Sequence, residues 1–520
     1  MRDFDRFISV KEMQIQDKNS SDYGIPPSTL MECAGFSAVQ SIKNIPLKKQ
    51  DHATIVCGTG NNGGDGFVIA RHLLAEQIQV TLILAGHPDH IRTSEAKLNW
   101  DVLQALLMNL SIYIASDSSF FTQIPKDLEL RLKKSKVIID CLLGTGIRGR
   151  VREPIRSAIE FINSFSNKPI KIVSIDVPSG IDPDTGNKAD YYVKPNILIT
   201  FHRKKTGFSK IEVPEIIVNP IGIPREADLF VGSGDLKFVL PKRAEDNHKG
   251  QYGKVLIIGG SKQYSGAPAL AGMAALQMGI DLVYVFAPKS VADVIRSYSP
   301  NLIVRSGNQD YICVSDLPEI QELIDRVDAV VLGPGLGKDP GLGNAISGIL
   351  SYLKNGNTPI VIDANAIQLS KPFKNELQSI KAIFTPHTNE FFELTEKRLF
   401  EQKDFHKQIK FIEEAVKEWG STFLIKGRYD YISDGKNTRI NKTGVPEMAV
   451  GGTGDILTGV LVSLLSLKIN LFDAACCAAY INGKLGELYQ IYQKGTNKNG
   501  YPLKSSDLLE YIPIVLKQDT

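Results

Sequence analysis

Residues 53–74, ATIVCGTGNNGGDGFVIARHLL, decide the fold of the first half of the chain. A short run typical of a buried strand, 53–57, leads into a glycine-rich loop, 58–66, and an apolar helical run follows at 67–74. A strand that passes through a short loop into a helix is the repeating unit of a parallel sheet with helices on both faces. The stretch therefore predicts an α/β domain.

The same alternation of strand and helix runs along most of the chain. Apolar and β-branched runs predict further strands at 80–84, 137–140, 170–175, 255–258, 282–286, 329–332, 360–363, 383–385 and 423–425. Between residues 219 and 254 the alternation lapses, and Pro and Gly punctuate the sequence as in a connection between domains. We therefore expect two α/β domains, residues 1–235 with a parallel sheet and the larger 236–520.

One helix of the first domain is expected to begin at Thr93 or Ser94. Leu98, Val102 and Leu106 then fall on one stripe, because they recur at helical spacing. We expect this stripe to face the core.

The composition is that of a globular protein and argues against two kinds of partner. Sixty Lys and Arg against 57 Asp and Glu leave a net charge of +3, so no overall field favours nucleic acid or an anionic membrane. The longest strongly apolar stretch, 456–467, is far shorter than the roughly 20 residues of a membrane span. The charged start, 1–6, lacks the apolar core of a signal peptide, which favours a cytoplasmic protein. Parallel-sheet domains with apolar helices often associate, which leaves a homo-oligomer open.

Polar, glycine-containing loops follow three predicted strands of the first domain. They are 58–66, 140–150 and 176–182. Because the carboxyl ends of parallel strands share one edge of a sheet, where open α/β sheets bind ligands, these loops predict a pocket. Asn62, Asp140 and Ser179 offer hard oxygen ligands of low charge, which suit a monovalent or weakly held cation. Glycines that serve tight packing and acids that cap a turn are the structural alternatives.

Four segments of the first domain form an ordered set of motifs. They are LMECAG at 30–35, NNGGDG at 61–66, LLGTG at 142–146 and DVPSG at 176–180. This order resembles the NAD(P)H-hydrate epimerase domain, and the resemblance spans most of residues 1–230. It implies a Rossmann-like fold that binds a hydrated nicotinamide nucleotide and a potassium ion (K+) and interconverts the R and S hydrates. Asn62, Asp140 and Ser179 would hold the potassium ion. The residues that would line the nucleotide site are Asn61, Asn62, Gly63, Gly64, Asp65, Gly144, Thr145, Gly146, Ile147, Arg148, Gly149, Arg150 and Asp176.

Asp176 is the candidate for acid–base chemistry in the first domain. Interconversion of the hydrates needs reversible loss of the C6 substituent or ring opening, and hence a group that passes protons near an iminium-like cation. A later segment, PNIL at 195–198, stands where the family has an Ala-Asp-x-Thr pattern. This departure leaves a non-catalytic nucleotide-binding module as an alternative.

The most informative segment of the second domain is AVGGTGDILTG at 449–459, followed by an apolar helix. Its glycines let backbone N–H groups point at a phosphate, and the helix N-terminus adds partial positive charge. Asp455 would lie beside that phosphate and accept a hydroxyl proton, although an acid in a first helical turn also has a plain capping role. Further loops after strands are 333–337, 385–390 and 426–430.

These segments, with HKGQYG at 248–253, GGS at 259–261 and YSGAP at 264–268, form a second ordered set. The set resembles ribokinase-like small-molecule kinases and, more closely, ADP- or ATP-dependent NAD(P)H-hydrate dehydratases. The residues that the resemblance implies to contact the hydrate are Ala267, Gly335, His387 and Asp455. Those that it implies to bind the adenine nucleotide are Lys426, Gly427, Arg428, Tyr429, Asp430 and Gly454. Asn365 stands where Asp is common, a departure that bears on metal or water binding.

The two resemblances in one chain predict a bifunctional repair enzyme. The second domain would phosphorylate the C6 hydroxyl with Asp455 as base, and phosphate would then leave to restore the dihydronicotinamide. With ADP and Mg2+ the products would be NAD(P)H, AMP and phosphate. Fusion of the domains resembles the bacterial form, for which ADP is the expected donor. A kinase of a vitamin-type alcohol is the alternative, because 452–455 is shared with that larger group.

Overall fold

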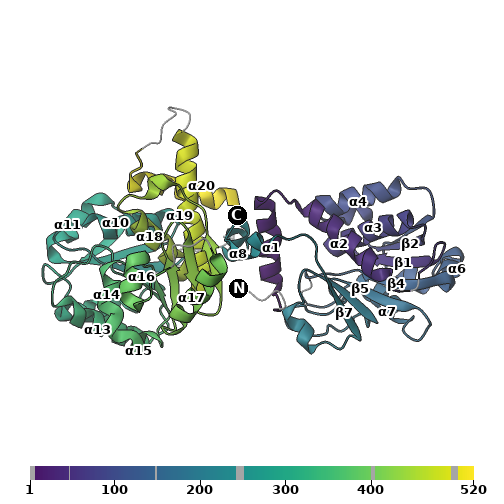
Figure 1. The fold of residues 1–520 in the computed structure, drawn as a ribbon, viewed down its shortest axis with the longest axis horizontal. Helices are drawn as coiled ribbons and strands as arrows, with labels where there is room; N and C mark the ends of the chain where they lie inside the picture. The colour runs from purple at the N-terminus through teal and green to yellow at the C-terminus, as the bar shows by residue number, and fades with distance from the viewer. Residues whose placement is uncertain are drawn as a thin grey trace. The chain divides into compact units, whose positions relative to one another are not determined.

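The structure is a computed structural model that describes residues 6–45, 47–146, 149–241, 251–399, 404–493 and 502–519. The chain divides into two compact units, Asp3–Pro224 and Arg225–Thr520, called here the first and the second unit. Figure 1 labels their elements along the chain.

The first unit contains one parallel sheet in the order β3-β2-β1-β4-β5-β6-β7. Its strands are β1 (His52–Cys57), β2 (Gln79–Ala85), β3 (Leu110–Ala115), β4 (Ser135–Cys141), β5 (Lys171–Ile175), β6 (Ile197–Phe201) and β7 (Glu215–Asn219). Its helices are α1 (Val10–Asp22), α2 (Pro27–Ile42), α3 (Asn61–Ala75), η1 (Pro88–His90), α4 (Ser94–Gln104), α5 (Ser119–Thr122), α6 (Lys126–Lys134), α7 (Ile155–Asn163) and η2 (Thr206–Lys210). The predicted α/β class with a parallel, Rossmann-like sheet is confirmed.

Alternate residues of the first unit's strands face two layers of helices. Ile55 and Ile139 pack in one cluster with residues of α2 and α3, and Val56 and Ile138 pack in another with residues of α6 and α7. All four side chains are fully buried. Burial of both faces is the reason that these strands read as continuous apolar runs.

The prediction for the helix after Thr93 is half wrong. Helix α4 begins at Ser94 with Thr93 as its N-cap, as expected. The predicted stripe, however, is exposed, by 58% for Leu98 and by 37% for Val102 and for Leu106, and Leu106 lies beyond the end of α4. The buried face carries Trp100, whose ring packs against Phe67 of α3. The larger aromatic ring, with its greater apolar area, faces the core instead of the aliphatic stripe.

The second unit is built on a mixed sheet in the order β10-β9-β8-β11-β12-β13-β14-β15-β16. Its strands are β8 (Lys254–Ile258), β9 (Leu282–Ala287), β10 (Leu302–Ser306), β11 (Ala329–Leu332), β12 (Ile360–Ile362), β13 (Ala382–Phe384), β14 (Thr422–Ile425), β15 (Asp430–Ser433) and β16 (Thr438–Asn441). Neighbouring strands pair in parallel along the sheet from β10 at one edge, through β9 and β8, as far as β14. Strands β15 and β16 extend the other edge in antiparallel fashion.

Helices cover both faces of the second sheet. They are α8 (Arg225–Leu229), α9 (Ser233–Val239), α10 (Gly266–Gln277), α11 (Lys289–Tyr298), η3 (Val314–Asp316), α12 (Leu317–Ile324), α13 (Leu342–Lys354), α14 (Asn365–Ser370), η4 (Lys371–Phe373), α15 (Lys374–Leu377), α16 (Thr388–Thr395), α17 (Phe405–Lys417), η5 (Pro446–Met448), α18 (Thr453–Ser466), α19 (Leu471–Gln493), η6 (Ser505–Tyr511) and α20 (Ile512–Asp519). The α/β class predicted for this half is confirmed.

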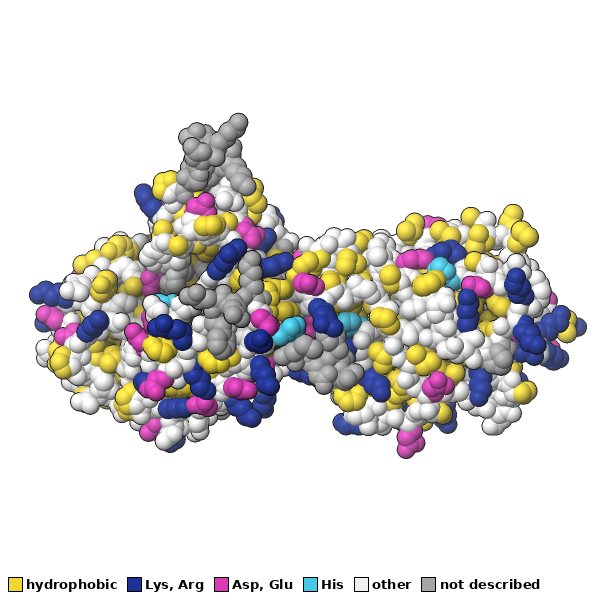
Figure 2. Space-filling view, in the orientation of Figure 1, with side chains coloured by type: hydrophobic (Ala, Val, Ile, Leu, Met, Phe, Trp, Pro, Cys, Tyr) yellow, Lys and Arg dark blue, Asp and Glu magenta, His cyan; other side chains and the backbone are white. Residues whose placement is uncertain are grey.

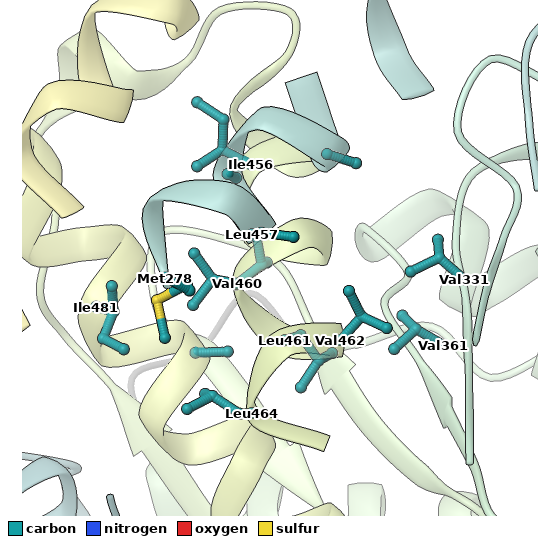
Figure 3. Close-up of a cluster of buried hydrophobic side chains, with 14 of the residues drawn as sticks. Met278, Val331, Val361, Ile456, Leu457, Val460, Leu461, Val462, Leu464 and Ile481 are labelled. Atoms are coloured by element: carbon teal, nitrogen blue, oxygen red, sulfur yellow. The ribbon is translucent and has the colours of Figure 1, made fainter. Parts of the chain in front are cut away.

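Helix α18 lies at the centre of one core layer. Figure 3 shows Val460 and Leu464 of α18 near Met278 and Ile481, and Val462 toward Val331 and Val361 of the sheet. After the first turn, every residue of α18 from Ile456 to Ser466 is buried, and most of these residues are apolar. Core packing therefore fixes the body of the helix whose first turn carries Asp455.

The change of unit falls at Arg225, whereas the lapse in the sequence pattern suggested a boundary near residue 235. Helix α9 packs against α19, and Asp235 forms a buried ion pair with Arg439 of β16 at 2.9 Å. The short helices α8 and α9 therefore belong to the second unit although their sequence reads as a connection.

Charged side chains of both signs are interspersed over the face shown in Figure 2, in keeping with a net charge of +3. Among the described residues, no helix combines the length and the apolar character needed to cross a membrane.

Candidate functional sites

The first unit has a topological switch point between β1 and β4. The chain proceeds from these neighbours in opposite directions across the sheet, so a crevice forms at their carboxyl ends. A Cβ at Gly58 would lie 2.1 Å from the Leu142 carbonyl oxygen, and one at Gly63 would lie 1.9 Å from the Gly58 carbonyl oxygen. Only glycine fits at both positions, so close packing accounts for part of this glycine-rich loop.

Asn62, Asp140 and Ser179 lie together around the peptide group of Leu143. Asn62 Nδ2 donates to the Leu143 carbonyl oxygen at 2.9 Å, and the Leu143 amide donates to Ser179 Oγ at 2.9 Å. Ser179 Oγ in turn donates to Asp140 Oδ1 at 2.6 Å. Three elements distant in sequence thus bring the three predicted cation ligands to one place.

This group of oxygens fits a monovalent cation. Asn62 is only 6% exposed, and its Oδ1 has no hydrogen-bond partner among the described residues. Asp140 is completely buried, and burial raises the pKa of its carboxyl while hydrogen bonds from Ser179 and Ser174 oppose the rise. A cation would satisfy the free amide oxygen and balance the buried carboxylate.

Asp176 follows β5 in a left-handed conformation, with a φ of 62° that is strained for a residue other than glycine. Its Oδ1 accepts a hydrogen bond from Lys205 Nζ at 2.5 Å. The Lys205 side chain is 1% exposed, and its Nζ also donates to Thr200 Oγ1 at 3.0 Å and to the Phe201 carbonyl oxygen at 3.1 Å. The strained backbone thus holds a carboxylate against a buried ammonium group.

Two further carboxyl groups interact with this ion pair. Burial and the charge of Asp176 raise the pKa of Asp17, in α1, to about 7, and Lys205 opposes the rise. Burial, Asp176 and Asp17 raise the pKa of Asp65, in α3, well above its usual range. Asp17 and Asp65 therefore both interact with the Asp176–Lys205 pair, and their raised pKa values favour the protonated forms more than in a free Asp side chain.

The loop after β4 lies beside the loop after β1. A Cβ at Gly144 would be 3.3 Å from Asn62 Cβ, and Asn61 Oδ1 accepts from Thr93 Oγ1 at 2.6 Å. Of the remaining predicted nucleotide-site residues, Gly64 is buried in α3, and Thr145, Gly146, Gly149 and Arg150 lie in the β4 loop. Ile147 and Arg148 lie outside the described residues.

The second unit has its switch point between β8 and β11. A Cβ at Gly333 would lie 1.8 Å from the Asp363 carbonyl oxygen. Gly335 has a φ of 68°, and a Cβ there would lie 3.3 Å from Ala267 Cβ. Two of the predicted hydrate-binding residues, Ala267 and Gly335, are therefore neighbours in the crevice. Of the motif at 248–253, residues 248–250 lie outside the described residues.

Asp455 lies in the first turn of α18, after Gly452 with its left-handed φ of 97°. Burial and the charge of Asp363 raise the pKa of Asp455 to about 7, and Lys426 opposes the rise. Lys426 Nζ donates to Asp363 Oδ1 at 3.0 Å, and a Cβ at Gly454 would be 3.4 Å from the same Nζ. A base poised near neutral pH, a lysine and a helix N-terminus thus meet, as phosphoryl transfer requires.

Asp363 connects this site to three elements. It is 2% exposed and accepts from Thr385 Oγ1 at 2.6 Å and from Thr458 Oγ1 at 3.0 Å, besides Lys426. Asp363 was not among the residues predicted for the site. Its signal was an acid at the end of a buried strand, the same signal that singled out Asp140.

His387 and the segment 426–430 lie side by side, joined by a bridge between His387 and Lys426. His387 Nδ1 accepts from the amides of Asn389 and Glu390 at 3.1 Å each, so this side chain also caps α16. The imidazole remains 54% exposed. A structural role and a ligand contact through Nε2 are therefore compatible.

The turn at 426–430 is stabilised by hydrogen bonds to the carboxylate of Asp430, its last residue. The Gly427 amide donates to Asp430 Oδ1 at 3.0 Å, and Asn441 Nδ2 donates to Asp430 Oδ2 at 2.9 Å. Burial raises the pKa of Asp430 to about 6 against these hydrogen bonds and Lys426. The Arg428 guanidinium lies 5.7 Å from the centre of the Tyr429 ring.

Both departures from the family patterns have structural roles. Asn365 Nδ2 donates to the Gly337 carbonyl oxygen at 3.2 Å, which ties α14 to the loop after β11. Asn196 Oδ1 accepts from the Ile172 amide at 2.8 Å, so Asn196 begins the pairing of β6 with β5. This contact is at the amino end of β6, whereas Asp176 lies at the carboxyl end of β5.

Each unit thus places glycine loops and buried, titratable side chains at the switch point of an α/β sheet, which defines a two-site enzyme of small metabolites. Residues 27–207 match the family described as YjeF-related protein N-terminus, and residues 255–513 match NAD(P)H-hydrate dehydratase. Bifunctional NAD(P)H-hydrate repair enzymes of Methanothermobacter thermautotrophicus and Pyrobaculum aerophilum are 40% and 37% identical to this chain. The alignments cover 98% of this chain in both cases, and 96% and 98% of the relatives. The chain belongs to the family of bifunctional NAD(P)H-hydrate repair enzymes.

Among solved structures, the ADP/ATP-dependent NAD(P)H-hydrate dehydratase from Bacillus subtilis, co-crystallized with ATP/Mg2+, is similar to part of the chain. It is 22% identical, with a TM-score of 0.45, and the match covers 56% of this chain and 99% of that one. A ribokinase-like superfamily protein from Enterococcus faecalis is also 22% identical, with a TM-score of 0.48 over 56% of this chain and 96% of that one.

Proposed function

We propose that the chain repairs hydrated nicotinamide nucleotides at two separate sites. The first unit interconverts the R and S hydrates of NADH and NADPH, and the second unit dehydrates the S form with ADP, giving NAD(P)H, AMP and phosphate. The observation that carries the proposal is the match to bifunctional repair enzymes over 98% of the chain. A kinase of a vitamin-type alcohol is not favoured by this match.

In the second unit, Asp455 acts as the base. It accepts the proton of the C6 hydroxyl while that oxygen attacks the β-phosphorus of ADP and AMP leaves. Lys426 and the N-terminus of α18 stabilise the charge on the transferring group. The C6–O bond then breaks and phosphate leaves with the bonding electrons, and loss of the proton from C5 restores the dihydronicotinamide.

The ligand contacts in the second unit follow from the same assignment. Ala267, Gly335 and His387 contact the hydrate, and Gly454 and the segment 426–430 hold the adenine nucleotide. A Mg2+ ion would take its ligands from the nucleotide phosphates and would neutralise part of their charge. Among the described residues, no group of three or more His, Cys, Asp and Glu side chains is placed to hold a metal by itself.

In the first unit, Asp176 is the acid–base residue, and the loops after β1 and β4 bind the nucleotide. Asn62, Asp140 and Ser179 would hold a potassium ion, which supplies positive charge beside the bound nucleotide. The buried, unpartnered Oδ1 of Asn62 supports this assignment. The cytoplasm remains the predicted location.

Two substitutions test the division of labour. Asp455→Ala should abolish dehydration and leave the exchange of R and S hydrates intact, because the two carboxyl groups serve different sites. Asp176→Ala should do the reverse: the S hydrate is repaired at the native rate and the R hydrate slowly. Both reactions are followed by chromatographic separation of the hydrates. Loss of both activities in either variant, with the fold intact, would refute separate sites.

A further inference from the structure

The first-unit site contains a carboxyl group with no evident structural role. Asp17 lies in the middle of α1, which carries none of the glycine motifs. Its Oδ1 is buried and makes no hydrogen bond to any described residue. Burial of an unpartnered carboxyl oxygen costs free energy, so a gain in function is the expected reason for its presence.

Helix α1 is anchored directly beside Lys205. The Ile8 amide donates to the Lys204 carbonyl oxygen at 2.9 Å, and the Thr206 amide donates to the Ile8 carbonyl oxygen at 3.0 Å. The Val10 amide, at the start of α1, donates to Asp184 Oδ1 at 2.8 Å. Backbone pairing on both sides of Lys205 therefore fixes the helix that presents Asp17 to the Asp176–Lys205 pair.

We propose that Asp17 is the second acid–base group of the epimerising site and works as a pair with Asp176. The inference rests on the proposed function of the first unit. Inversion at C6 requires that water leaves from one face of the ring and returns to the other. One carboxyl group on each face would serve both events, and Asp17 and Asp176 come from different elements, α1 and the end of β5.

The Asp17 carboxyl protonates the C6 hydroxyl, the C6–O bond breaks with its electron pair leaving on water, and the N1 lone pair forms the C6=N1 iminium bond. A water molecule then bonds to C6 from the other face while the Asp176 carboxylate takes its proton, and the iminium π electrons return to N1. The net change is inversion of the hydrate and transfer of one proton from Asp17 to Asp176. Exchange with solvent restores the pair.

The protonation states suit this exchange. The charged and titratable groups that interact with Asp17 are Asp176, Lys205 and Asp65. Burial and Asp176 place the pKa of Asp17 at about 7. Forward and reverse inversion both need a pair that holds one proton, so the rate should fall as the pH rises above about 7 and the proton is lost.

Asp17→Asn in the full chain tests the proposal. Starting from pure S hydrate without ADP, we expect the kcat for formation of R hydrate to fall by about 100-fold or more, with KM little changed. The residual rate should no longer decline above pH ~7, because the group that titrates there is gone. Asp22→Asn is the matched control: Asp22 is an exposed residue of the same helix, and its replacement should leave rate and pH profile unchanged.

Three outcomes separate the explanations. A native chain that does not exchange the hydrates would refute the proposed function itself. If the native chain exchanges the hydrates and the Asp17→Asn variant retains both the rate and the decline at high pH, the role of Asp17 is overturned. The second acid–base role would then pass to Asp65. A uniform loss of rate that keeps the native pH profile would show a merely structural effect and would also overturn it. Incorporation of oxygen-18 from labelled water at C6 is expected, and retention of the original oxygen would contradict the elimination step.

Discussion

Asp455 has an environment that predicts the pH dependence of the second reaction. Burial and Asp363 raise its pKa to about 7, and a base must be ionised to accept the C6 hydroxyl proton. The kcat/KM of dehydration should therefore rise with pH up to about 7 and then level off. Replacement of Lys426 by Met removes the opposing positive charge and should shift this midpoint upward. An unchanged midpoint in the Lys426→Met variant would show that Lys426 and Asp455 are not electrostatically coupled.

Asn62 predicts a cation requirement for the first reaction alone. Its unpartnered Oδ1 and the buried charge of Asp140 favour a bound potassium ion. Exchange of the protein into a tetramethylammonium buffer should slow the exchange of R and S hydrates and leave dehydration of S hydrate unchanged. Asn62→Ala should raise the potassium concentration for half-maximal epimerisation by about tenfold or more. Equal activity with and without potassium would contradict this assignment.

The packing of α18 on α10 predicts that Gly459 is needed for the stability and the activity of the second unit. A Cβ at Gly459 would lie 2.1 Å from the Ala271 carbonyl oxygen of α10, and backbone atoms have little room to move. Gly459→Ala should therefore lower the free energy of unfolding by about 1–3 kcal/mol and slow dehydration by displacing Asp455. Gly343→Ala in α13 is the control, since nothing lies within 4 Å of a Cβ there. Denaturant unfolding compares the two variants.

At the level of elements, sequence patterns predicted most of the buried central strands, but they missed β6, which lies between β5 and β7, and the strands at the edges. Strands β3 and β10 lie at sheet edges, and β15 and β16 form an antiparallel edge pair, where short, partly polar strands lack the continuous apolar signal. The face of α4 was mispredicted because Leu98 and Val102 recur as regularly as the buried residues do. Local spacing does not show which of two stripes meets the sheet.

The site residues also divide into those that the sequence could predict and those that it could not. Residues at or just after the carboxyl ends of strands, such as Asp140 in β4 and Asn62 in the first turn of α3, were predictable because topology alone brings them to one edge. Asp17 was not, because it approaches Lys205 only through pairing of the N-terminal segment with residues 204–206. Asp363 carried a readable signal, but its contacts with Lys426 and Thr458 depend on tertiary packing.

At the scale of the whole molecule, the two sites complement each other chemically. Dehydration as proposed here acts on the S hydrate, so the R hydrate is repaired only if the first unit converts it. A chain that carries both sites can therefore return any mixture of hydrates to NAD(P)H with one phosphate donor. Both units would then act on the same metabolite in series.

The most direct test of this claim is recovery of dihydronicotinamide absorbance from a purified mixture of R and S hydrates. The protein, potassium and Mg2+ are kept constant, ADP or ATP is the only variable, and AMP and phosphate are measured at the end. We predict complete recovery with ADP, with one AMP and one phosphate formed per hydrate repaired. Recovery that stops when the S hydrate is exhausted would show that the first unit only binds nucleotide. A stable phosphorylated product without recovery would contradict the repair of hydrates by either unit.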